Sequence, residues 1–150
     1  MKTIIFFILC VLCCMNNNNI STNNIKYIEI RKVDFEILTF FHIDCDFFDK
    51  TFGKDKYTIS VSDKYEIERI VKLINALEMD KSNRNPDVRA KLLIHYTSNN
   101  TDTICMDSGT LMYNNNYYTV NKELINYINE LFKKELEELL KRWLPFLYGK

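Results

Sequence analysis

The chain has 150 residues, of which 47% are hydrophobic and 13% aromatic, enough apolar material for one folded domain. Its 20 basic and 20 acidic side chains give a formal net charge of zero, with no basic stripe. This balance argues against a nucleic-acid partner, because nucleic-acid binding needs a concentrated positive surface.

Residues 1–14 have the layout of an export signal. Lys2 precedes an apolar run over 4–12, and small residues follow. The run is too short to cross a bilayer, which takes roughly 20 apolar residues. We therefore expect an exported protein in which a polar, Asn-rich tether over 15–24 leads to a single domain over 25–150.

The end of this leader carries a short motif, Val11-Leu12-Cys13-Cys14. It resembles the lipobox of bacterial lipoproteins, in which aliphatic and small residues precede the cysteine that receives the lipid. The resemblance implies that Cys14 becomes a lipidated N-terminus and anchors the protein to a membrane. Cys13 departs from the pattern, because the family usually has Gly, Ala or Ser there. The alternative is ordinary cleavage and release as a soluble protein.

The first half of the domain reads as three strands and a helix. Apolar and polar residues alternate over 25–33 and 41–48, and 57–61 is a further short strand. Apolar residues at three- and four-residue spacing then predict a helix that is capped by Ser62-Asp63 and ends near Met79. The second strand would bury one alternating set of residues: Phe41, Ile43, Cys45 and Phe47.

The second half reads as consecutive strands followed by a helix. Strands are expected over 91–97, 102–106 and 110–120, and the last contains an Asn run that favours a hairpin turn. A long amphipathic helix, with Asn121 as its candidate cap, begins at about Lys122 and ends before Pro145. The order β-β-β-α-β-β-β-α predicts an α+β fold in which two helices pack on a mostly antiparallel sheet.

Five cysteines occur in the chain, and three belong to the leader. The other two, Cys45 and Cys105, could form one disulfide in an oxidising compartment. The alternative is that both are small buried residues that never meet, because nothing in the sequence places them together.

Only one constellation suggests metal chemistry. His42, Asp44 and Asp46 would share one face of the second strand, where they could bind a divalent cation. The alternative is a solvated strand face, which we favour because the segment lacks the glycine of a calcium loop and has a single histidine. No catalytic residue and no cofactor motif is identified.

Two surface features complete the list of candidate sites. In the loop before the fourth strand, Arg84 and Arg89 could take a carboxylate partner or pair with nearby charges such as Asp87. At the end of the last helix and beyond it, an aromatic cluster either contacts a partner or folds back onto the sheet. This cluster comprises Trp143, Phe146 and Tyr148.

A signal, a polar tether and one compact α+β domain together resemble the small exported or lipidated bacterial proteins of unknown function. The resemblance implies a cell-envelope location and assigns no catalytic residues. We therefore expect a non-catalytic binding protein whose partner is an unknown protein or small ligand at the envelope. The alternatives are a secreted inhibitor or immunity protein that blocks an enzyme, and a small metal-dependent hydrolase that uses His42, Asp44 and Asp46.

Overall fold

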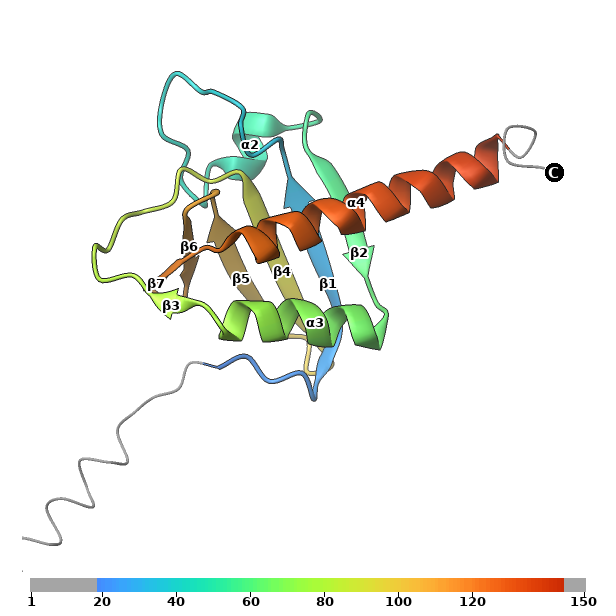
Figure 1. Cartoon of the computed structure of the whole chain (residues 1–150), viewed down its shortest axis with the longest axis horizontal. Coiled ribbons are helices and arrows are strands. Elements are labelled where there is room, and N and C mark those ends of the chain that lie inside the picture. The colour runs from blue at the N-terminus through green and yellow to red at the C-terminus, as the bar shows by residue number, and fades with distance from the viewer. Residues whose placement is uncertain (1–18, 145–150) are drawn as a thin grey trace, which may run out of the picture.

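The structure is a computed structural model, and it describes residues 19–144. The predicted leader over 1–14, the lipidation at Cys14 and the contact residues Phe146 and Tyr148 lie outside the described residues. The described chain folds around a single sheet (Figure 1).

The sheet has seven strands in the order β2-β1-β4-β5-β6-β7-β3, and every neighbouring pair is antiparallel. Together with the helices, this confirms the predicted α+β class. The tight turn of the β6–β7 hairpin uses Asn114 and Asn115, whose φ angles are 48° and 59°. The strands are β1 (Ile25–Lys32), β2 (Tyr57–Val61), β3 (Glu78–Met79), β4 (Ala90–Tyr96), β5 (Thr101–Met106), β6 (Thr110–Tyr113) and β7 (Asn116–Thr119).

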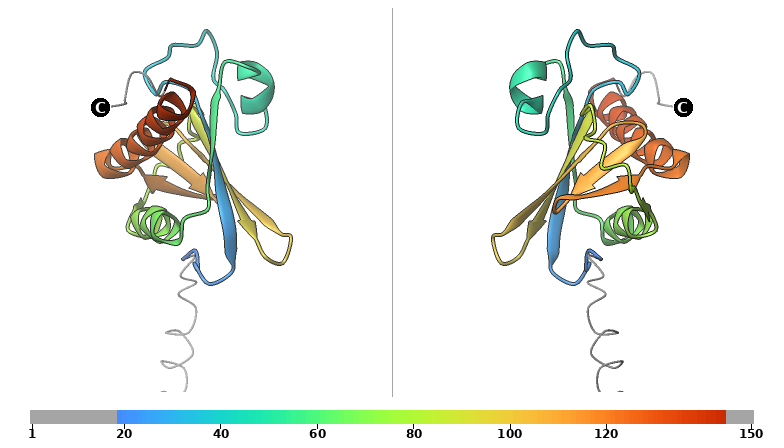
Figure 2. Two further views of the ribbon diagram at one scale, coloured as in Figure 1. Left: turned by 90° about the vertical axis from the view of Figure 1, so that its right-hand side faces the viewer. Right: turned by 90° about the vertical axis from the view of Figure 1, so that its left-hand side faces the viewer.

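The described helices are α2 (Phe48–Phe52), α3 (Lys64–Asn75) and α4 (Lys122–Trp143). Helices α3 and α4 cover one face of the sheet, and α2 lies on the opposite face (Figure 2). Both long helices start at capping side chains, as the sequence predicts. Asp63 accepts a hydrogen bond from the Glu66 amide, and Asn121 accepts one from the Leu124 amide. None of the helices within residues 19–144 is long and apolar enough to cross a membrane.

The main core fills the space between the sheet and the two long helices. Residues at alternate positions of β1, β2, β4, β5 and β6 are buried there, so the period-two pattern of these strands sets which face is covered. Its fully buried members include Ile28, Ile30, Ile70, Leu92, Ile94, Ile104, Met106, Leu111, Leu124 and Ile128.

A smaller apolar cluster lies on the other face of the sheet, beneath α2. It attaches α2 and the preceding loop to strand β5, because Cys105 of that strand is one of its members. A disulfide joins Cys45 of the loop to Cys105, with their Cα atoms 5.7 Å apart. The buried members of the cluster are Val33, Ile43, Phe48, Phe52, Val88 and Cys105.

The strand predicted over 41–48 is wrong. The segment up to Phe47 is a loop, and α2 follows it directly. Of the alternating set expected to be buried, Ile43 is buried, but Phe41 and Phe47 are exposed. Phe48, on the opposite side of the alternation, is fully buried. The segment does not pair as a strand because its backbone makes no ladder of hydrogen bonds: the Ile43 carbonyl accepts from the Val88 amide, and the Ile43 amide donates to the Asp87 side chain.

The helix predicted to end near Met79 stops at Asn75 instead. Its last turn is followed by β3, in which Glu78 and Met79 pair with Thr119 and Tyr118 of β7. Helix α3 therefore connects the two edge strands of the sheet, β2 and β3. Leu77 remains buried and closes the core at that point.

Candidate functional site

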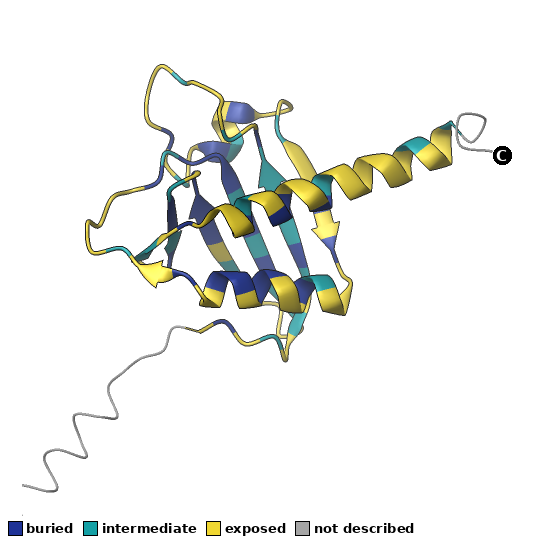
Figure 3. Cartoon of the chain, viewed as in Figure 1, coloured by how far each residue is buried: buried dark blue, intermediate teal, exposed yellow. Residues whose placement is uncertain are grey.

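The loop between β1 and α2, residues 33–47, presents five large apolar side chains to solvent, and four of them lie within residues 37–41. Leu38 is 93% exposed and Phe41 66%, and Phe40 is fully exposed. Ile37 is also exposed. We call these four residues, Ile37, Leu38, Phe40 and Phe41, the apolar tip. Figure 3 shows that this loop is mostly exposed.

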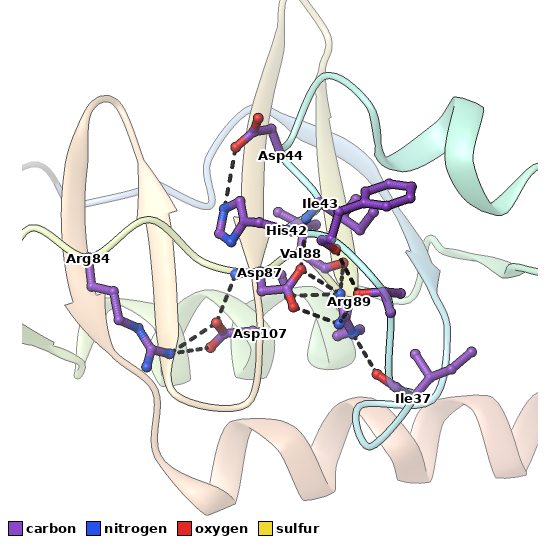
Figure 4. Close-up of polar contacts among 11 residues, drawn as sticks. Ile37, His42, Ile43, Asp44, Arg84, Asp87, Val88, Arg89 and Asp107 are labelled. Atoms are coloured by element: carbon purple, nitrogen blue, oxygen red, sulfur yellow. Dashed lines mark hydrogen bonds and ion pairs between the residues drawn. The ribbon is translucent and has the colours of Figure 1, made fainter.

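Arg89 lies beneath the loop and holds it through its guanidinium (Figure 4). The residue is buried, with 5% of its surface exposed. Its Nε donates to the carbonyl of Ile37 at 3.1 Å, and its Nη2 donates to Thr39 Oγ1 at 3.0 Å. A guanidinium carries five N–H donors in a rigid fork, so one side chain can fix several points of a loop. The position of the apolar tip is thus set by polar contacts to its backbone.

Asp87 links this clamp to a second point of the loop. Its two oxygens accept hydrogen bonds from Arg89, at 2.9 and 2.7 Å, and one also accepts from the Ile43 amide at 2.8 Å. Burial alone would raise the pKa of the Asp87 carboxyl, but the hydrogen bonds from Arg89 and Ile43 outweigh it and lower the pKa. Asp87 is therefore ionised at neutral pH and keeps both contacts.

A second carboxylate, that of Asp107, fixes the backbone that carries Asp87. It accepts from the amides of Asp87 at 3.0 Å, Gly109 at 2.6 Å and Thr110 at 2.7 Å. On its outer side Arg84 pairs with it at 3.1 Å. Of the two alternatives drawn from the sequence for the arginines of this loop, the structure shows pairing with nearby charges.

The disulfide anchors the end of the loop nearest α2. The sequence does not decide whether Cys45 and Cys105 pair. The structure joins them in a disulfide across a separation of 60 residues. Cys105 is fully buried in β5. The loop is thus fixed at its middle by Arg89, at Ile43 by Asp87 and near its end by the disulfide.

The surroundings of the apolar tip are acidic. Residues 34–46 contain four acidic side chains and no Lys or Arg. A cleft of about 540 Å³ opens beside the disulfide. Its lining includes Asp44, Asp46, Asn85, Lys91 and Asn114. The acidic residues of the loop, two of which line this cleft, are suited to contact basic or hydrogen-bonding groups of a partner.

The metal candidates are not gathered into one site. His42 and Asp44 lie close, with Nε2 and Oδ1 3.4 Å apart, on a loop rather than a strand face. Within the described part of the chain, no group of three or more His, Cys, Asp or Glu could hold a metal ion. The expected shared face of His42, Asp44 and Asp46 is wrong because the strand that would create it does not form.

Trp143, the one described member of the predicted aromatic contact cluster, does not fold back onto the sheet. It ends α4 with 76% of its surface exposed. The buried residues of α4 stop at Leu131, and the helix continues away from the sheet (Figure 1). The C-terminal half of α4 is therefore a second exposed apolar surface.

A further polar cluster, at the β4–β5 end of the sheet, is structural. The hydroxyls of Tyr96 and Tyr113 both donate to Asp102 Oδ2, at 2.8 and 2.7 Å. Burial, followed by the hydrogen bond to Asp102, raises the pKa of Tyr113 to about 12 and also raises that of Tyr96. Both phenols keep their protons at neutral pH and act as donors that tie strands together.

Sequence reasoning missed the apolar tip. A signal was present, because Phe40 and Phe41 are neighbours and adjacent residues of a strand face opposite sides. The pair Phe47 and Phe48 carries the same signal. At least one aromatic ring of each pair has to leave a one-sided core.

No known protein family, curated protein or solved structure matches this chain.

Proposed function

We propose that the chain is an exported, non-catalytic binding domain whose apolar tip inserts into an apolar pocket of a partner protein. The observation that carries the proposal is that four large apolar side chains are exposed on a loop whose backbone is clamped. Contiguous exposed apolar surface commonly marks an interaction site. A loop already held in place loses less conformational entropy on binding, which favours affinity.

Charge favours a protein partner over a lipid surface. The apolar tip is flanked by exposed acidic residues, Asp34 and Glu36 before it and Asp44 and Asp46 after it. An anionic membrane surface would repel these carboxylates. A protein pocket with a basic rim would be complementary to them.

Export is part of the proposal, and the disulfide supports it. Disulfides such as Cys45–Cys105 persist mainly in oxidising compartments outside the cytosol. A mass beginning at Cys14 with acyl chains added would support a lipid-anchored form, and an unmodified shorter mass would support release. Full-length protein retaining Met1 in the cytosol would contradict export.

A secreted inhibitor or immunity protein is the second candidate, and the clamped loop favours it. An inhibitor that occludes an active site gains from a rigid, projecting segment with apolar side chains. This candidate requires that the partner be an enzyme whose activity falls on stoichiometric addition of the chain.

Site-specific photocrosslinking tests the proposal. A photoreactive phenylalanine analogue placed at Phe40 should give one discrete protein adduct in cells that naturally express the chain. The matched control is the same analogue at Tyr65, an exposed aromatic of α3. Substituting Arg89→Met should reduce the adduct at position 40, since the loop is then no longer clamped.

Three outcomes would overturn the proposal. Equal adducts from positions 40 and 65, or none from position 40, would mean that the apolar tip has no dedicated protein partner. Flotation of the protein with neutral phosphatidylcholine vesicles, abolished by Phe40→Asp, would instead assign the tip to a lipid surface.

A further inference from the structure

The C-terminal half of α4 carries an apolar stripe that the described chain leaves largely uncovered. Leu136, Leu139 and Trp143 are exposed, while Phe132 and Leu140 are half-buried. Their spacing places all five on one side of the helix. The stripe lies beyond the last buried residue of the helix, Leu131. Its first member, Phe132, also packs against the main core, and the other four lie past the part of the helix that packs on the sheet.

A helical end of this kind gains little stability from its own backbone. Residues 133–143 extend past the sheet (Figures 1 and 3). The segment continues a helix that is already nucleated on the sheet, but most helical stability in proteins comes from packing of an apolar face. Packing of the stripe against another apolar surface would supply the missing stabilisation.

The stripe follows the four-then-three spacing of a coiled-coil seam. Phe132, Leu136, Leu139 and Trp143 occupy alternating d and a positions of a heptad. Leu140 follows Leu139 and widens the seam on one side. A partner surface that matches this pattern is another helix with the same repeat.

Charges next to the seam select a second copy in antiparallel orientation. If Leu136 of one copy packs against Leu139 of the other, Phe132 packs against Trp143 by the same symmetry. Glu135 and Arg142 occupy the g positions. In this arrangement Glu135 of one copy faces Arg142 of the other, and the two side chains carry opposite charges. Two Glu135–Arg142 pairs form in one dimer. A parallel pair would place Glu135 opposite Leu140 and lose this complementarity.

We infer that the projecting half of α4 is an antiparallel self-association site, occupied by the same segment of a second copy of this chain. The overlap from Phe132 to Trp143 is about 17 Å at 1.5 Å per residue, so the contact is short. A short seam of four apolar layers is expected to give a weak, concentration-dependent dimer. The apolar tip is on a different element, so this inference does not depend on the proposed function.

Sedimentation velocity of the full mature chain over a hundredfold concentration range tests the inference. The wild type should shift from monomer to dimer. Glu135→Arg and Arg142→Glu should each weaken dimerisation about tenfold, because each creates two like-charge contacts. The double variant should restore it, and an equimolar mixture of the two single variants should form a heterodimer. The control is Glu137→Arg, an equal change of charge on the far side of the helix, which should leave dimerisation unchanged.

The substituted residues are exposed, and far-UV circular dichroism checks that each variant is folded. Leu136→Glu with Leu139→Glu should abolish the dimer in a folded protein. A wild type that stays monomeric at every concentration would overturn the inference. Unaltered dimerisation in both single charge variants would overturn it as well, because it would place the interface elsewhere.

Discussion

The β1–α2 loop and the C-terminal half of α4 both expose large apolar side chains, but they are held in different ways. The loop is irregular, yet Arg89, Asp87 and the disulfide fix it to the sheet. The helix is regular, yet its last side-chain tie to the domain is the pair between Lys134 and Glu66 at 3.1 Å. Regular secondary structure is therefore a poor guide to rigidity here. The loop owes its shape to the chain itself, and the helix end depends on what packs against it.

Removing the Arg89 guanidinium should release the β1–α2 loop from the sheet and have one of the largest effects on stability. Arg89→Met deletes the donors to Ile37 and Thr39 and leaves the carboxylate of Asp87 without its main partner. We expect the free energy of unfolding to fall by about 3 kcal/mol. Urea unfolding measures it. Arg84→Met, at a pair whose arginine side chain is 63% exposed, should cost less than about 1 kcal/mol. Equal effects of the two substitutions would mean that burial of the guanidinium is unimportant.

Opening the disulfide should have an effect of similar size. Replacing Cys45 with Ser and Cys105 with Ala should lower the free energy of unfolding by about 2–4 kcal/mol, since the link spans 60 residues. Alkylation and mass spectrometry of the native oxidised protein should find neither thiol free. Two reactive thiols in the exported protein would contradict the account of how the loop is anchored.

The pH dependence of stability tests how Glu66 of α3 ties the domain to α4. The hydrogen bond from the Tyr127 hydroxyl, opposed by burial, and the bond from Lys134 lower the pKa of Glu66. As the pH falls, Glu66 therefore binds a proton at a higher pH in the unfolded chain than in the folded chain. The stabilisation that ionised Glu66 gives the folded chain is lost as the pH falls through the lowered pKa. At pH 7, Glu66→Gln should lower the free energy of unfolding by about 1 kcal/mol.

At an acidic pH below the lowered pKa of Glu66, most of the difference between wild type and Glu66→Gln should be gone. The control is Glu68→Gln on the same helix, whose pair with Lys64 is exposed and should contribute little at either pH. A difference for Glu66→Gln that is the same at both pH values would argue against an ionic tie between α3 and α4.

Local patterns predicted the sheet and the two long helices because each feature is encoded within a few residues. Alternation marks β1 and β2, Asp63 and Asn121 mark helix starts, and the Asn run marks the β6–β7 turn. The loop escaped prediction because its structure depends on Arg89, which lies 50 residues after Thr39. The period-two spacing around Ile43 predicted a strand, although Ile43 is the one residue of that alternating set that is buried.

The candidate site was predictable only in part, for the same reason. The sequence indicated Cys45, Cys105 and Trp143, but it could not show that the first two meet or which way the third faces. Disulfide pairing and exposure depend on the packing of distant elements.

Amide hydrogen exchange, measured at low and at high protein concentration, tests most directly whether the β1–α2 loop is held by the chain itself and the end of α4 by a partner. The account predicts that the hydrogen-bonded amides of Ile37 and Ile43 are protected at both concentrations. Amides over 133–143 should exchange rapidly in dilute solution and become protected as the concentration rises. Rapid exchange at Ile37 and Ile43, or protection over 133–143 that is independent of concentration, would contradict it.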